Sequence, residues 1–121
     1  VIAEDGTGIL IDEVFTLVER TLDGSFVVRT NPFDPTLEPA EFRYFLDQPH
    51  DLTFVVLTLT GEPVYHRDIP AGDPGAEDGE NVLFWDGRND VGQIVVNGVY
   101  LAIISLGTDG PRATLKLAVL K

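Results

Sequence analysis

The sequence predicts an all-β fold, an immunoglobulin-like antiparallel β-sandwich of about seven to nine strands. Three observations indicate this class. Helical periodicity is nearly absent, short apolar runs rich in Val, Ile, Leu, Phe and Thr recur along the chain, and clusters of Gly, Pro, Asp and Asn separate them. The 121 residues are enough for one domain with a core and too few for two ordinary ones. An eight-stranded barrel is the alternative architecture.

The expected strands follow the apolar runs, because β-branched and aromatic residues bounded by turn residues favour strands. In chain order they cover residues 9–20, 25–30, 40–46, 52–60, 63–69, 81–85, 93–96, 98–106 and 113–120. At five boundaries a glycine follows a polar residue, which favours a chain reversal: Gly24, Gly61, Gly87, Gly98 and Gly110. The Gly- and Asp-rich run 71–80 is expected to be an exposed loop.

Two of these runs indicate their place in the sheets. The run 52–60 is apolar on both alternating faces, from Leu52, Phe54 and Val56 to Val55, Leu57 and Leu59, so we expect a central and largely buried strand. The run 113–120 alternates apolar with more polar residues, which fits one face on the core and one in water. Tyr100, opening the run 98–106, suits a tyrosine corner whose hydroxyl ties a loop to the sandwich.

Composition excludes several classes of function. The 20 acidic and 8 basic residues give a formal net charge of −12, which would repel nucleic acids and anionic membrane surfaces. There is no cysteine, so disulfides and thiolate chemistry are excluded. No apolar run approaches the ~20 residues of a membrane span. Two histidines cannot make a zinc site alone, and neither serine lies on a nucleophile elbow, so we expect a non-catalytic protein.

The stretch 82–92, VLFWDGRNDVG, places the only tryptophan beside oxygen-rich turn residues. Asp86, Asn89 and Asp90 offer hard oxygen ligands, and a calcium site is therefore one interpretation, although the spacing does not match the calcium loop of helix–loop–helix proteins. No other cofactor is expected.

The second interpretation of the same stretch is structural. Trp85 at a strand end would bury its indole, Asp86 would accept backbone N–H bonds, and Gly87 and Gly92 would supply positive φ. This interpretation accounts for more of the residues.

The order of motifs resembles the FlgD-like immunoglobulin domain family, which includes the type A C-terminal sorting domains of proteins secreted by the type IX system. The motifs are NPFDP at 31–35, FRYFL at 42–46, LTGEPVY at 59–65, WDGRNDVGQIVVNGVY at 85–100 and KLAVLK at the end. The resemblance covers residues 28–121, with Asp34 where the family usually has asparagine. It implies that the structural motif comprises Asn31, Pro32, Phe33, Trp85, Asp86, Gly87, Gly92, Asn97, Gly98 and Tyr100.

The resemblance also implies a non-catalytic module, located outside the cell or on a bacterial surface, that binds protein partners such as a secretion machinery. No catalytic residues carry over. For a sorting signal it implicates the last strand, with Lys116 on its water-facing side and Lys121 at its end.

Residues 1–24 are assigned as an N-terminal extension before a sandwich of residues 25–121. The extension is apolar and β-branched enough for one or two further strands, with Ile9, Ile11, Val14, Phe15 and Leu17 as candidate assembly residues. Exchange of this strand between like subunits would build an extracellular homopolymeric filament, which is the alternative function. A calcium-dependent adhesive or carbohydrate-binding module is the third.

Overall fold

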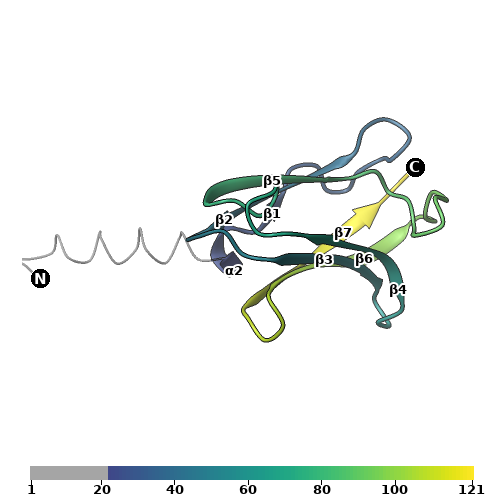
Figure 1. The fold of residues 1–121 in the computed structure, drawn as a ribbon. Coiled ribbons are helices and arrows are strands. Elements are labelled where there is room, and N and C mark those ends of the chain that lie inside the picture. The colour runs from purple at the N-terminus through teal and green to yellow at the C-terminus, as the bar shows by residue number, and fades with distance from the viewer. Residues whose placement is uncertain (1–21) are drawn as a thin grey trace, which may run out of the picture.

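Two antiparallel sheets make up the part of the chain that the computed structural model describes, residues 22–121 (Figure 1). One sheet has three strands in the order β1-β2-β5, and the other has four in the order β4-β3-β6-β7. The elements are α2 (Leu22–Ser25), β1 (Val27–Val28), β2 (Ala40–Leu46), β3 (Leu52–Thr58), β4 (Pro63–Ile69), β5 (Gly79–Trp85), β6 (Gly98–Leu106) and β7 (Arg112–Val119). Separate sheets confirm the sandwich and exclude the barrel.

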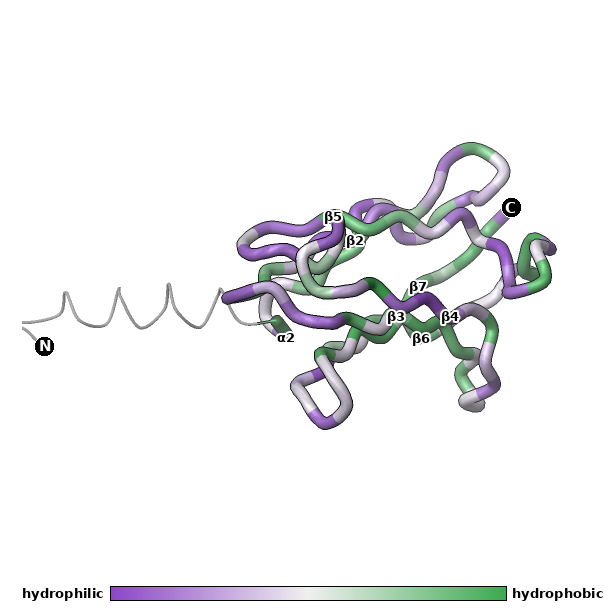
Figure 2. The backbone as a smooth tube through the Cα atoms, in the orientation of Figure 1, coloured by the Kyte–Doolittle hydropathy of each residue, from purple (hydrophilic) through white to green (hydrophobic). Residues whose placement is uncertain are grey.

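The core lies between the sheets, because alternate side chains of each strand point inward. In β2 the inward set is Ala40, Phe42, Tyr44 and Leu46, all of them buried. In Figure 2 the hydrophobic colour follows β3 and β6, whereas β4 and several connecting loops carry hydrophilic residues. Aromatic rings fill the centre, with Phe42 against Phe54 at a centroid distance of 5.2 Å.

The expectation of a central strand at 52–60 is confirmed, since β3 pairs with β4 on one side and β6 on the other. Its last residues differ from the prediction. The strand ends at Thr58, where the Thr58 N–H donates to Glu62 O and the Gly61 N–H donates to Thr58 O. This turn carries Leu59 away from the core, and its side chain is exposed.

The expected strand 25–30 is reduced to the two residues of β1. The Phe26 N–H donates to Leu22 O, which closes the helical turn α2, and the Ser25 hydroxyl oxygen accepts from the Phe45 N–H of β2. The Ser25 side chain therefore accepts the hydrogen bond that the carbonyl of a strand residue would otherwise accept. The turn spans the boundary expected between 24 and 25, and Leu22 is buried in the sandwich.

The strand expected at 93–96 is wrong, and the run 71–80 is only partly an exposed loop. Residues 93–96 form a single bridge between Ile94 and Arg88, because the loop after β5 bonds to itself, as where the Val95 N–H donates to Gly87 O. Within 71–80, Ala76 is buried, and β5 already begins at Gly79.

The candidate assembly strand 9–20, with Ile9, Ile11, Val14, Phe15 and Leu17, lies outside the described residues. Within residues 22–121, no helix is both long and apolar enough to span a membrane.

Candidate functional site

Trp85, the last residue of β5, is the centre of an aromatic cluster at one end of the sandwich. Its side chain is buried, and its indole N–H donates to Arg88 O at 2.9 Å. The rings of Phe33, Tyr65 and Tyr100 surround it at centroid distances of 5.8, 6.2 and 6.4 Å. The indole thus joins the segment after β1 to strands of both sheets and to the loop that follows it.

Tyr100 connects the aromatic cluster to the loop before β6. Its hydroxyl donates to Val96 O at 2.6 Å, and burial raises the pKa of its phenol. The neighbouring Asn97 accepts the Lys121 N–H through its side-chain oxygen at 2.9 Å. The tyrosine therefore holds the loop whose asparagine binds the chain just after β7.

The NPF motif at 31–33 binds β7 along the side that does not pair with β6. The Asn31 amide donates to Lys116 O at 3.0 Å and accepts from the Ala118 N–H at 2.9 Å. The Phe33 N–H donates to Ala118 O, and the Leu120 N–H donates to Phe33 O. The Asn31–Pro32 peptide bond is cis. With Asn97, these contacts form a clamp, which we define as Asn31, Phe33 and Asn97 holding residues 116–121.

The clamp leaves side chains of the held segment in water. Lys116 and Lys121 are exposed, and Leu120 is 60% exposed despite being apolar. β7 ends at the same end of the sandwich as this clamp, whereas α2 lies at the opposite end (Figure 1). The clamp therefore presents the side chains of Lys116, Leu120 and Lys121 to water on main chain that is held in place.

Asp34 stabilises the turn that follows the NPF motif. Its carboxylate accepts hydrogen bonds from the Thr36 hydroxyl and the Thr36 N–H. These bonds, with a smaller contribution from the charge of Lys121, hold the pKa of the Asp34 carboxyl below its ordinary value. Asp34 therefore stabilises this turn, at a position where the resemblance to FlgD-like domains implies asparagine.

The three oxygen-bearing residues of the calcium interpretation have backbone partners. Asp86 accepts from the Arg88 N–H, Asn89 accepts from the N–H groups of Val91 and Gln93, and Asp90 accepts from the His66 N–H of β4. Gly87 and Gly92 have φ of 78° and 87°. No group of three or more His, Asp and Glu side chains suited to a metal ion occurs among residues 22–121.

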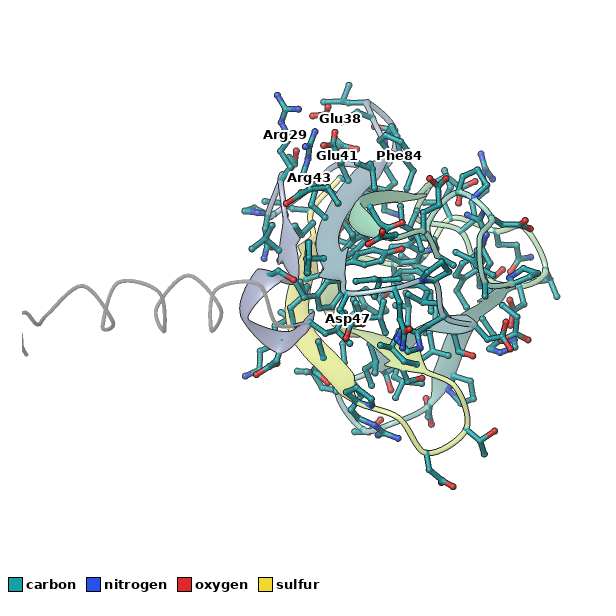
Figure 3. The ribbon with its side chains drawn as sticks, turned by 60° about the vertical axis from the view of Figure 1, so that its left-hand side comes forward. Arg29, Glu38, Glu41, Arg43, Asp47 and Phe84 are labelled. Carbon is teal, nitrogen blue, oxygen red and sulfur yellow. The ribbon has the colours of Figure 1, made fainter. Side chains whose placement is uncertain are left out.

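A second surface lies on the outer face of the three-stranded sheet. The strand registers form two rows across it, Val27–Arg43–Val82 and Arg29–Glu41–Phe84. Figure 3 shows Arg29, Glu41 and Arg43 gathered on one side of the molecule, with Phe84 beside them. Glu41 lies between the two arginines, 2.7 Å from Arg43 Nε and 3.5 Å from Arg29. Phenylalanine and arginine are enriched at protein interfaces, so exposed Phe84 with Arg29 and Arg43 gives this face the character of a protein-binding surface.

Sequence reasoning named the clamp residues but not the segment that they hold in common, and it missed Leu120 and the outer-face residues Val82 and Phe84. Strict alternation in β5 could have found the latter two, because they alternate with buried Leu83 and Trp85. Nothing in the sequence indicates that Asn31 reaches Lys116, 85 positions later.

Comparison with known proteins gives likeness at the level of structure. No protein-family model matches the sequence, and no curated protein matches it. Among solved structures, FlgD from P. aeruginosa is 20% identical with a TM-score of 0.55, covering 77% of this chain and 69% of that one.

FlgD from Xanthomonas campestris is 22% identical with a TM-score of 0.52, covering 80% of this chain and 63% of that one. This chain shares its fold with FlgD. The FlgD-like immunoglobulin-like fold implied by the motif order is thereby confirmed.

PorZ of Porphyromonas gingivalis, an essential bacterial surface component of the type IX secretion system, is 18% identical with a TM-score of 0.54. The likeness to PorZ covers 79% of this chain but only 11% of PorZ. FlgD-like folds thus occur both in a surface component of secretion and in the protein that caps the flagellar hook.

Proposed function

We propose that this domain is a non-catalytic sorting or anchoring module, recognised outside the cytoplasm by a protein of a secretion or surface-attachment machinery. The observation that carries the proposal is the clamp on residues 116–121. Three residues from two loops hold this segment by its main chain, while Lys116, Leu120 and Lys121 remain exposed. Preorganised main chain lowers the entropy cost of binding, so a short exposed segment can serve as a recognition signal.

Two further observations support the proposal. The fold is shared with PorZ, whose own role is at the bacterial surface in type IX secretion. The outer face of the three-stranded sheet offers a second surface of protein-binding character, with Arg29, Arg43 and Phe84 exposed. The net charge of −12 disfavours nucleic acid and anionic membranes as partners.

The experiment is secretion of a passenger. A fluorescent protein with the 121-residue chain fused to its end is expressed in a bacterium with a type IX system, and passenger in medium and at the cell surface is measured. We expect export with the native chain and a loss of tenfold or more with Leu120→Asp or Lys116→Glu.

Leu59→Asp is the matched control, because Leu59 is 55% exposed, against 60% for Leu120, but lies in the β3–β4 turn. Export equal in all variants, or no export of the native fusion, would contradict the proposal. Circular dichroism of each purified chain establishes that folding is unchanged.

A further inference from the structure

The four-stranded sheet has an outer face that is apolar at its centre. In β3, Phe54 and Val56 are buried in the core, so the alternate residue Val55 and its neighbour in the same set, Leu57, point the other way. None of the outward side chains of β3 and β6 that are apolar belongs to the hydrophobic core. We name this set the aliphatic face, and its members are Val55, Leu57, Val99, Leu101 and Ile103.

The aliphatic face is open within the part of the chain that the structure describes. The three-stranded sheet packs on the inner face, as the contact of Phe42 with Phe54 shows, and Leu22 of α2 is also in the core. Four of the five aliphatic side chains are half-buried, and Val99 is 42% exposed. A strand that is apolar on both faces is typical of burial on both faces. In β3 and β6 only the inner face is covered, so the outer face lacks a partner.

One margin of the aliphatic face, along β4, is acidic. The Asp68 carboxylate accepts the Thr53 hydroxyl at 2.8 Å and lies 3.2 Å from His66 Nε2. Thr53 comes two residues before Val55 in β3 and points to the same side, so Asp68 also lies on this face. Glu62 is exposed in the turn just before β4. This margin therefore carries two carboxylates and one histidine.

The opposite margin, along β7, is basic. Arg112 ends the row that begins at Asp68 on β4, and Lys116 ends the row that contains Leu57 and Leu101. Asp68 and Arg112 are three strand spacings apart, about 14 Å, so they do not pair within one chain. The two cations balance the two carboxylates of the other margin. This face therefore does not share the acidic excess of the chain.

We propose that the aliphatic faces of two copies of this chain pack together as a symmetric dimer. The face requires a partner with an apolar centre and two margins of opposite charge, and a second copy supplies all three. A two-fold axis parallel to the strands places β7 of one copy over β4 of the other, so Arg112 of each copy faces Asp68 of the other. An axis perpendicular to the strands would instead place β4 over β4 and β7 over β7, where like charges meet.

The same axis also matches the apolar centres. It places β3 of one copy over β6 of the other, so Val55 packs on Ile103 and Leu57 packs on Leu101. Stacked sheets lie about 10 Å apart, and aliphatic side chains from both sheets fill that gap in sandwich cores. An arginine and an aspartate side chain together can span the same gap at the margin.

The size of the aliphatic face indicates a weak dimer. Four strands spaced about 4.8 Å apart and eight residues at about 3.4 Å each cover roughly 19 by 27 Å, or roughly 500 Å². A standard stable interface buries about 800 Å² on each partner. The charged margins determine which way the copies meet more than they add affinity. We therefore expect reversible association with a dissociation constant on the order of 100 μM.

The test exchanges the charges of the two margins. Sedimentation equilibrium of the 121-residue chain, whose mass is 13.2 kDa, measures dimer against protein concentration. In the dimer, Asp68→Arg places two arginines opposite each other at each contact, and Arg112→Asp places two aspartates there. We expect each variant alone to raise the dissociation constant at least about tenfold. An equimolar mixture of the two variants should form a heterodimer about as tightly as the native chain, because each contact then has one charge of each sign.

Asp47→Arg is the matched control, since it changes the charge of the chain by the same amount as Asp68→Arg. The Asp47 carboxylate lies 3.3 Å from a histidine, as that of Asp68 does at 3.2 Å, but it belongs to the loop between β2 and β3. This control should not raise the dissociation constant. Circular dichroism of each variant establishes that the strands are retained.

Four results would overturn the proposal. They are a native chain that stays monomeric at about 1 mM, ten times the expected dissociation constant, single variants that dimerise as tightly as the native chain, a mixture that associates no more tightly than its components, and a control as weak as Asp68→Arg. The inference does not depend on the proposed function, and neither Asp68 nor Arg112 belongs to the clamp or to the segment that it holds. Failure of the dimer and failure of export are therefore distinguishable.

Discussion

At the residue scale, single side-chain donors placed against single main-chain oxygens hold the loops of this sandwich. The Tyr44 hydroxyl donates to Gly75 O at 2.5 Å, and the Trp85 indole N–H donates to Arg88 O at 2.9 Å. Burial raises the pKa of the Tyr44 phenol, which remains neutral and a donor at physiological pH. Removing a buried donor of this kind is costly, because the oxygen left behind has no hydrogen bond from the protein and none from water.

Replacing Tyr44→Phe tests this directly. We expect a loss of about 1–3 kcal/mol in the free energy of unfolding, since Gly75 O is left unsatisfied in a buried place. Urea unfolding followed by tryptophan fluorescence measures it. Tyr65→Phe is the control and should change stability by less than about 0.5 kcal/mol. Its ring packs on Phe54 and Trp85, contacts that phenylalanine keeps. Equal effects of the two variants would contradict the account.

Asp34 gives a pH-dependent prediction. Its hydrogen bonds to Thr36 hold its pKa below the ordinary 3.8, so its stabilisation is fully present above that pH and is lost as pH falls through the folded-state pKa. In Asp34→Asn there is no carboxylate to protonate. We therefore expect the melting temperature of the native chain to fall more steeply below pH 3.8 than that of the variant. Parallel curves from scanning calorimetry would show that Asp34 contributes nothing.

At the scale of elements, the loop between β5 and β6 acts as a folded unit, although its sequence suggested a strand. Gly87 lies where this loop passes the segment after the NPF motif, and a Cβ at this position would come within 2.5 Å of Pro35 Cβ. Gly92 has a similar φ, but no atom lies within 4 Å of the position its Cβ would take. Substitutions at the two glycines therefore distinguish the cost of a positive φ from the cost of close packing.

We expect Gly92→Ala to cost about 1 kcal/mol of stability, the cost of placing an L-residue at positive φ. Gly87→Ala should cost about 1–3 kcal/mol more, because Pro35 must also move. Chemical denaturation of both variants measures the difference. If the two alanine variants are equally stable, contact with Pro35 does not constrain the loop.

At the scale of the whole molecule, the acidic surface and the edges of the sheets govern association. The net charge of −12 favours solubility, and Asn31 and Asp90 each occupy one edge of the four-stranded sheet with a polar side chain. The carboxylate of Asp90, a candidate calcium ligand in the sequence, accepts the His66 N–H of β4. At both edges of this sheet, polar side chains therefore form hydrogen bonds that a neighbouring strand would otherwise form.

Adding and removing calcium tests whether the loop that contains Asp86, Asn89 and Asp90 binds this ion. We expect calcium at millimolar concentration and a chelator to leave the melting temperature unchanged within about 1 °C, because Asp86, Asn89 and Asp90 already accept backbone N–H bonds. Magnesium at the same ionic strength controls for charge screening. A rise of several degrees that is specific to calcium would instead establish a bound ion.

The sequence by itself determined the class of fold and the bounds of several strands. The runs at 40–46, 63–69 and 98–106 coincide with β2, β4 and β6, because their residue types and turn boundaries act locally. It could not determine the short β1, where the Ser25 hydroxyl binds the Phe45 N–H of β2, or the loop at 93–96, where Gly87 O binds the Val95 N–H within the same loop. Only the tertiary structure decided that Asn31 holds Lys116 and Ala118. Contacts between residues so far apart depend on the path of the whole chain, and no local pattern encodes that path.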